Sequence, residues 1–188
     1  MITRRLERLV AAERRVLREL GSIESTVLDE VLPRLSRAAD HDVLWIGIAG
    51  GLALSGRSGR RVAGRGLVAL SLASATTNVL LKRASGRRRP PSGLVPAWRE
   101  PRRVPFTASF PSGHAASAAA FTTAVVLELP WSAVPLVPLV PLAGAVATSR
   151  VVIGVHYPSD VVAGVALGVA AGVATRTHLG GDGHVGRI

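Results

Sequence analysis

Three polar clusters interrupt a largely apolar chain, and their residue types suit the binding of a phosphate group. The clusters cover residues 82–90, 111–114 and 149–160. Among them, Lys82, Arg89 and Arg150 supply three cations, and the two guanidinium groups have a forked geometry that matches phosphate oxygens. A phosphomonoester carries nearly two negative charges near neutral pH. These cations would therefore bind such a group and stabilise the charge on it during its transfer.

The second cluster has the composition of a helix start. Pro111 suits the first turn of a helix, and Ser112, Gly113 and His114 follow it directly. Free backbone N–H groups at a helix start bind anions. Gly113 lets the backbone approach an anion closely, and the Ser112 hydroxyl adds a donor. We therefore expect Ser112 and Gly113 to bind the same phosphate as the three cations.

Together the clusters resemble the three-part signature of the type 2 phosphatidic acid phosphatase superfamily, which is K-x6-RP, PSGH and SR-x5-H-x3-D. All three parts occur in order and without substitution. The resemblance covers residues 82–160 and, in helical layout, most of the chain. K-x6-RP is weakly specific in so Arg-rich a sequence. The other two parts each fix four positions, and each would occur by chance in about one in a thousand chains of this size.

The resemblance implies a mechanism through phosphohistidine. In it, His156 attacks phosphorus, and Asp160 holds the other ring nitrogen of His156 so that the attacking nitrogen stays unprotonated. His114 protonates the leaving alcohol oxygen and then activates water against the phosphohistidine. Pro158 suits the first turn of a helix, which would place Asp160 about one turn in and within reach of His156.

The expected mechanism uses no metal and no cofactor. The three cations and the helix start already supply positive charge at the phosphate, and the sequence has nothing that resembles a carboxylate-rich metal cage. The chain also has no cysteine, which excludes disulfides, thiolate metal sites and a cysteine nucleophile.

Five apolar stretches must position these clusters, at residues 43–56, 62–81, 115–129, 131–148 and 161–175. Two approach the roughly 20 residues that cross a bilayer core, and turns of the flanking motifs lengthen the others. Their Ala, Gly and Ser content suits close helix packing in lipid. We expect an all-α integral membrane bundle of about five transmembrane helices. The first cluster follows the second stretch, the second cluster precedes the third stretch, and the third cluster lies between the fourth and fifth stretches. If all five stretches span the membrane, the three clusters therefore lie on the same membrane face.

The chain divides into three predicted segments. Residues 1–30 are expected to form an amphipathic N-terminal helix, residues 31–176 a membrane-embedded phosphatase domain, and residues 177–188 a flexible C-terminal tail. In the first segment, apolar residues recur at helical spacing with arginines between them. Such a helix lies on an anionic membrane surface, packs on the rest of the domain or joins a coiled coil, and the sequence leaves these alternatives open. The segment lacks the apolar core of a cleavable secretory signal.

Composition and charge indicate a multi-pass protein of a bacterial cell membrane. Apolar residues make up 48% of the chain, yet its net charge is +11. A membrane protein combines both easily because charge collects in its loops. Most lysines and arginines fall on the side that holds the N-terminus and the clusters, so the positive-inside rule favours a cytoplasmic active site. Aromatic residues are only 4%, and no recognition motif suggests a nucleic-acid partner.

Several other polar residues receive structural interpretations. Asn78 lies one turn before Lys82 and either orders that lysine or forms a hydrogen bond between helices. Asp40 and Asp42 are interpreted as caps or flanks of the first apolar stretch. Five further arginines are interpreted as topology determinants or headgroup contacts: Arg83, Arg87, Arg88, Arg102 and Arg103.

The leading functional interpretation is a membrane lipid phosphatase that hydrolyses a phosphomonoester or diphosphate of a phospholipid or polyprenyl lipid. Phosphatidate and polyprenyl-phosphoribose 5-phosphate rank equally as substrates, and the oligomeric state is unknown. The alternatives are a vanadium haloperoxidase-like enzyme, a phosphatase for a soluble sugar phosphate on the same scaffold, and a non-catalytic membrane protein. Haloperoxidases are soluble and much longer than 188 residues, and an intact signature disfavours loss of catalysis.

Overall fold

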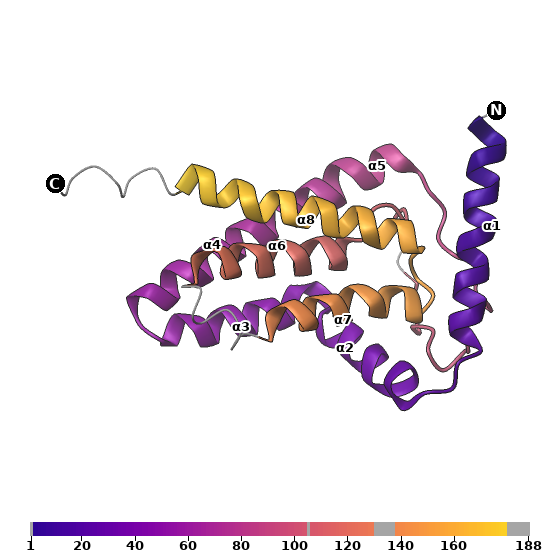
Figure 1. Cartoon of the computed structure of the whole chain (residues 1–188), viewed down its shortest axis with the longest axis horizontal. Helices are drawn as coiled ribbons and strands as arrows, with labels where there is room; N and C mark the ends of the chain where they lie inside the picture. The colour runs from indigo at the N-terminus through magenta and orange to yellow at the C-terminus, as the bar shows by residue number, and fades with distance from the viewer. Residues whose placement is uncertain (1, 105, 130–137, 180–188) are drawn as a thin grey trace.

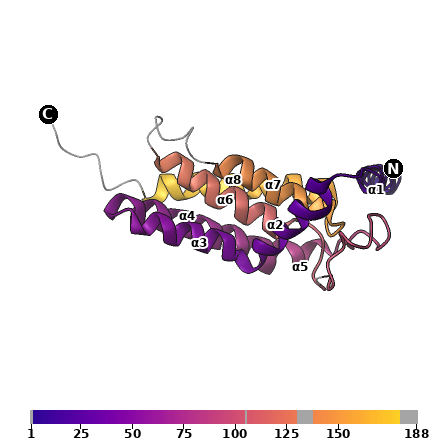
Figure 2. The same ribbon diagram turned by 90° about the horizontal axis from the view of Figure 1, so that it is seen from below.

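The computed structural model describes residues 2–104, 106–129 and 138–179 (Figure 1). Every regular element within these ranges is a helix, which confirms the all-α prediction. The body is formed by five helices: α3 (Val43–Leu54), α4 (Arg57–Ala75), α6 (Gly113–Glu128), α7 (Leu139–Val152) and α8 (Pro158–Leu179). They run side by side along the long axis of the molecule in Figures 1 and 2.

These helices fall on the predicted apolar stretches. The fourth stretch, residues 131–148, is only partly visible because residues 130–137 lie outside the described ranges. Of the predicted tail, residues 177–179 belong to α8, and residues 180–188 also lie outside the description. By length and composition, one described helix is long and apolar enough to cross a membrane, α8 over Pro158–Arg176, and α7 is apolar but shorter.

At the end of α4 the chain continues without a loop toward the first polar cluster. The wide helical turns of η3 (Thr76–Leu81) lead into the short α5 (Lys82–Ser85), which Gly86 ends in the left-handed conformation. An irregular segment, described over residues 86–104 and 106–112, then folds over this end of the bundle before α6 begins. The first cluster is thus attached to a helix at one end and to a long loop at the other.

Close contact between α6 and α8 depends on glycine. Gly164, Gly168 and Gly172 are spaced one turn apart along the face of α8 that meets α6. A Cβ atom at Gly164 would lie 2.4 Å from the Ser112 carbonyl oxygen, and one at Gly168 would lie 2.3 Å from that of Ala116. The absence of side chains lets the two backbones approach, as in small-residue helix contacts in membranes.

The N-terminal helix α1 (Ile2–Gly21) lies across the end of the bundle, roughly perpendicular to the other helices (Figure 1). It packs there through the fully buried Leu17, which contacts a cluster with Val95, Val151 and Tyr157. Most of its arginines are exposed. The helix ends at Gly21, where an added Cβ would lie 2.9 Å from the Leu94 carbonyl oxygen.

Between α1 and α3 the chain forms three short helices. They are η1 (Val27–Val31), α2 (Leu32–Ala38) and η2 (Asp40–Asp42). The helix predicted over residues 1–30 is therefore interrupted after Gly21, and its last residues belong to η1.

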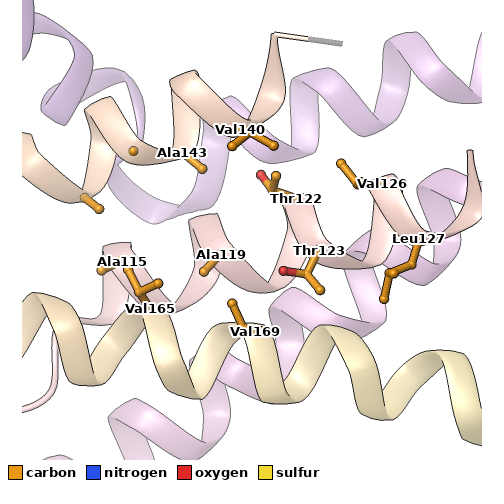
Figure 3. A pocket seen from close by; sticks show the side chains of 12 residues that line it. Ala115, Ala119, Thr122, Thr123, Val126, Leu127, Val140, Ala143, Val165 and Val169 are labelled. Carbon is orange, nitrogen blue, oxygen red and sulfur yellow. The ribbon is translucent and has the colours of Figure 1, made fainter. Parts of the chain in front are cut away.

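A groove of about 370 Å³ runs along α6 between α7 and α8. Figure 3 shows Ala115 and Ala119 of α6, Val140 of α7, and Val165 and Val169 of α8 around it. The lining side chains are small, and almost all of them are apolar. Packing between these three helices therefore leaves space at the level of the apolar stretches.

Candidate active site

The three predicted clusters meet at one end of the bundle, beside α1. Lys82 begins α5, Gly113 begins α6, and Arg150 lies in the last turn of α7. One cavity of about 300 Å³ is lined by six of the eight predicted site residues: Lys82, Arg89, Gly113, His114, Arg150 and His156. We call it the phosphate cavity. The other two, Ser112 and Asp160, are fully buried beside it.

Lys82 is held by the turn that precedes it. Its Nζ donates to Asn78 Oδ1 at 2.8 Å, and Asn78 Nδ2 lies 3.2 Å from Ser74 Oγ. Of the two interpretations of Asn78, the ordering of Lys82 is therefore the one that its contacts match. Burial, with the nearby charges of Arg89 and Arg150, lowers the pKa of Lys82 to about 8.

The two arginines are fixed by protein oxygens. Arg89 donates from Nε to the Thr107 carbonyl at 3.0 Å and from Nη1 to the Val155 carbonyl at 2.9 Å. Arg150 Nη1 bonds the Ser36 hydroxyl, while its buried Nε has no hydrogen-bond partner among the described residues. Both guanidinium groups are thus oriented before any anion enters the phosphate cavity.

His156 lies in the turn between α7 and α8, and its ring is buried. Nε2 is 3.2 Å from Arg89 Nη1, and Nδ1 is 3.5 Å from both Asp160 Oδ2 and Ser109 Oγ. Because a guanidinium group only donates, Nε2 accepts in this contact and the ring proton belongs on Nδ1. Burial and the charges of Arg89 and Arg150 lower the pKa of His156 to about 3, although Asp160 opposes the shift.

Asp160 lies in the first turn of α8, which begins at Pro158 as the sequence predicts. Its Oδ2 accepts hydrogen bonds from the Ser109 hydroxyl and, at 2.9 Å, from the Tyr157 N–H. Its carbonyl oxygen accepts the Ser112 N–H at 2.9 Å. Asp160 therefore connects the starts of α6 and α8 as well as facing His156.

The start of α6 differs from the prediction in one respect. Pro111 was expected in the first helical turn, and this is wrong, because the helix begins at Gly113. Ser112 has an extended backbone and acts as the N-cap, with its Oγ accepting the Ala115 N–H at 3.5 Å. The Ser112 hydroxyl thus faces its own helix, and Gly113 is the residue of this pair that lines the phosphate cavity.

His114 has a carboxylate partner that the sequence did not suggest. Its Nε2 lies 2.9 Å from Asp40 Oδ1, and Arg150 Nη1 lies 3.8 Å from the same oxygen. Asp40 was interpreted as a cap or flank of the first apolar stretch, but its side chain reaches the site instead. Hydrogen bonding to His114 lowers the pKa of Asp40.

A second carboxylate reaches the site from α1. Glu13 is buried, pairs with Arg87 Nη2, and accepts the Ser159 N–H at 2.9 Å. Arg87 Nη1 in turn lies 2.7 Å from Asp160 Oδ1 and 2.7 Å from Ser159 Oγ. Arg87 was interpreted as a topology determinant or a headgroup contact, but its guanidinium group packs inside the protein, because the loop that carries it folds back over the start of α8.

Comparison with known proteins assigns the family. The model of the PAP2 superfamily matches residues 64–180, which include all three motifs. The chain belongs to the PAP2 superfamily.

Relatives of this PAP2 chain include several lipid phosphatases. It is 41% identical over 154 residues to decaprenylphosphoryl-5-phosphoribose phosphatase of Mycobacterium tuberculosis, which covers 78% of each chain. For the protein of the same name from Mycolicibacterium smegmatis, identity is 36%, covering 69% of this chain and 67% of the relative. A lipid A 1-phosphatase of Rhizobium etli is 40% identical over 93 residues, or 47% of this chain and 38% of that protein.

Solved structures share the PAP2 fold. The transmembrane PAP2-type phosphatidylglycerolphosphate phosphatase of Bacillus subtilis superposes with a TM-score of 0.70 at 21% identity, covering 94% of this chain and 88% of that one. LpxE of Aquifex aeolicus gives a TM-score of 0.68 at 20% identity, covering 87% of this chain and 94% of that one.

Four residues of this PAP2 site were missed by sequence reasoning: Asp40, Arg87, Glu13 and Ser109. Glu13 did carry a signal, because it lies one turn before Leu17 on the apolar face of α1, where a carboxylate needs a partner. Arg87 stands in a run of three arginines, and Ser109 lies in an irregular loop. Nothing in their spacing distinguishes them from solvent-exposed residues.

Proposed function

We propose that this lipid phosphatase removes the terminal phosphate from a polyprenyl-phosphoribose 5-phosphate. The observation that supports phosphate chemistry is the phosphate cavity, where Lys82, Arg89 and Arg150 surround His156 and His114. The relatives favour this lipid over the others. The match of this chain to a decaprenylphosphoryl-5-phosphoribose phosphatase covers about three quarters of both proteins, whereas its match to a lipid A 1-phosphatase covers less than half of either protein.

In the proposed reaction, the three cations and the start of α6 bind the phosphate, and His156 Nε2 attacks phosphorus. The P–N bond forms as the P–O bond to the lipid breaks, and protonated His114 gives its proton to the leaving oxygen. Asp160 stabilises the positive charge that develops on His156 through its Nδ1–H. Water activated by His114 then cleaves the phosphohistidine and releases inorganic phosphate.

The carboxylate contacts suit these roles. A neutral His156 with its proton on Nδ1 carries an electron pair on Nε2, the atom that faces Arg89 and attacks phosphorus in the proposed reaction. Asp40 bonds Nε2 of His114 and so orients the imidazole that acts on the leaving oxygen in the first step. Glu13 and Arg87 orient Asp160 and do not line the phosphate cavity.

The proposed location is the cytoplasmic face of the bacterial cell membrane, with α3, α4, α6, α7 and α8 as five spans. Their alternating direction supports this arrangement, since it gathers all motifs at one end. The exposed arginines of α1 suit an anionic membrane surface at the same end. The reaction is proposed to need no metal, so activity should survive EDTA, and strict Mg²⁺ dependence would contradict the mechanism.

The decisive experiment is phosphate release by purified protein in detergent. The panel contains a polyprenyl-phosphoribose 5-phosphate, phosphatidate, phosphatidylglycerophosphate and a polyprenyl diphosphate. The expected result is the highest kcat/KM for the phosphoribose lipid and inhibition by vanadate. A preference for phosphatidate of tenfold or more would overturn the proposed substrate while leaving the phosphatase chemistry in place.

A further inference from the structure

Next to the phosphate cavity lies a second and larger cavity, of about 980 Å³. Its walls are α2, the start of η2 and the loop of residues 97–103. Asp40 belongs to its lining, and the carboxylate of Asp40 contacts His114 and Arg150 of the phosphate cavity. Asp40 therefore lies between the two cavities, because it lines the larger one and contacts two residues that line the phosphate cavity.

The second cavity is rich in uncommitted positive charge. Arg37 of α2 and Arg102 and Arg103 of the loop line it, and all three are exposed. Their guanidinium groups have no hydrogen-bond or ion-pair partner within residues 2–104, 106–129 and 138–179. We call this space the arginine cavity. Three guanidinium groups without protein partners around one cavity suit the binding of phosphate oxygens.

The remaining charged side chains of the arginine cavity are already occupied. Arg99 is buried and bonds Asp29 and the carbonyls of Leu20 and Ile23, which anchors the loop to the end of α1. Glu100 accepts the Gly93 N–H at 2.7 Å. Asp40 faces His114. The contacts of Arg99 thus hold the loop beside the site, three residues before Arg102.

In the proposed reaction, the arginine cavity lies on the side of the leaving group. His156 attacks on one side of phosphorus, so the leaving oxygen and its acid His114 lie on the other side. The rest of the substrate must extend past His114. The side chain that contacts His114 there is Asp40, which borders the arginine cavity.

We infer that the arginine cavity binds a second phosphate of the substrate, the phosphodiester that joins the sugar to the lipid. This inference rests on the proposed function, since a phosphoribose lipid carries such a phosphodiester in addition to its terminal phosphate. Arg37, Arg102 and Arg103 hold the phosphodiester, while Lys82, Arg89 and Arg150 hold the phosphate that is removed. The arginine cavity thereby selects lipids with two phosphates over those with one.

The test compares two substrates of matched solubility in neutral detergent without phospholipid. They are farnesylphosphoryl-ribose 5-phosphate, with two phosphates, and a short-chain phosphatidate, with one. The triple variant Arg37→Gln, Arg102→Gln, Arg103→Gln removes the free guanidinium groups. We expect the ratio of kcat/KM for the two substrates to fall roughly tenfold or more, through KM of the two-phosphate lipid, because charged hydrogen bonds are lost.

A matched control removes the same charge from the far end of the bundle, by Arg57→Gln, Arg60→Gln and Arg61→Gln. These arginines are exposed at the start of α4, and the control should keep the wild-type ratio. An unchanged ratio in the triple variant, or an equal loss in the control, would overturn the inference alone. Failure of the wild type to hydrolyse the two-phosphate lipid would overturn the proposed substrate as well.

A bilayer lipid is the competing source of the same phosphodiester chemistry. The measurements are therefore repeated with phosphatidylglycerol in the micelles. If the triple variant differs from the wild type only when phosphatidylglycerol is present, and equally for both substrates, the arginine cavity holds a bilayer headgroup and the inference is wrong.

Discussion

At the scale of single residues, the proposed reaction divides its work between two histidines with different partners. His156→Ala should lower kcat by at least about a thousandfold, since it removes the nucleophile. His114→Ala should be slow by roughly 10²–10⁴-fold, because the leaving oxygen loses its acid. Phosphate release and thermal unfolding of both variants in detergent would measure this. Near-wild-type turnover by His156→Ala would refute the nucleophile assignment.

Trapping the covalent intermediate provides a second test of the roles of His156 and His114. His114→Ala retains the nucleophile but lacks the base for hydrolysis, so labelled substrate should leave phosphate on His156. That label should be acid-labile and stable to base, and it should be absent from the double variant His114→Ala, His156→Ala. If no label can be trapped in any variant, the covalent route is wrong.

Lys82 should limit activity at alkaline pH. Its pKa is lowered to about 8, so it is protonated below that pH and loses its charge as the pH rises through it. Phosphate binding then weakens, and KM should rise above pH 8. Lys82→Arg keeps its charge over this range, so the rise in KM should disappear. An identical alkaline limb in Lys82→Arg would assign the effect to another group.

Sequence reasoning named six residues that line the phosphate cavity, and Asp160 beside it, but it did not identify Asp40 or Arg87 as their partners. The types and spacing of Lys82, Arg89 and Arg150 carry their chemistry in the sequence. By contrast, Asp40 and Arg87 are defined by partners 74 and 73 residues away, His114 and Asp160. Such pairing depends on tertiary packing, which a single sequence does not show.

At the scale of elements, α1 is connected to the site through Glu13 and Arg87. Glu13→Gln or Arg87→Gln should lower kcat about tenfold with little change in KM, since both orient Asp160 without lining the phosphate cavity. The double variant should be no worse than either single one, because the residues act as a pair. Glu7→Gln, at an exposed position of α1, is the matched control. A rise in KM at constant kcat would instead indicate direct binding of substrate.

The glycines of α8 set its distance from α6. Gly164→Ala would place a methyl group 2.4 Å from the Ser112 carbonyl oxygen, so the helices must separate beside Asp160. We expect the free energy of unfolding to fall by about 1–3 kcal/mol, and kcat to fall as well. Gly47→Ala on α3, with nothing within 4 Å of its Cβ, should be neutral or slightly stabilising. Equal behaviour of the two variants in thermal unfolding and turnover would contradict this account.

Periodicity and apolar content located the long helices, but they did not predict how the elements connect. The widened turns at η1 and η3 leave no distinct pattern in sequence. The end of α1 at Gly21 depends on the close approach of Leu94 from the loop. The loop around Arg99 is held by the contacts of this residue with Asp29 and Leu20, which lie far from it along the chain.

At the scale of the whole molecule, orientation can be measured without background, since the chain contains no cysteine. Arg83→Cys places a thiol at the site end and Arg57→Cys at the far end, and both positions are exposed. With the site in the cytoplasm, an impermeant maleimide added to intact cells should label Arg57→Cys alone. Labelling of Arg83→Cys alone would reverse the orientation, and labelling of both in sealed cells would show that α4 does not cross the membrane.

The groove between α6, α7 and α8 has a consequence for inhibition. It lies along the apolar part of the bundle and accepts hydrocarbon but offers almost no polar partner. A compound that fills it would gather first in the lipid phase, by roughly 0.8 kcal/mol per methylene group. Its potency would then follow the ratio of drug to lipid, and added empty vesicles would weaken it at a fixed total amount of the compound.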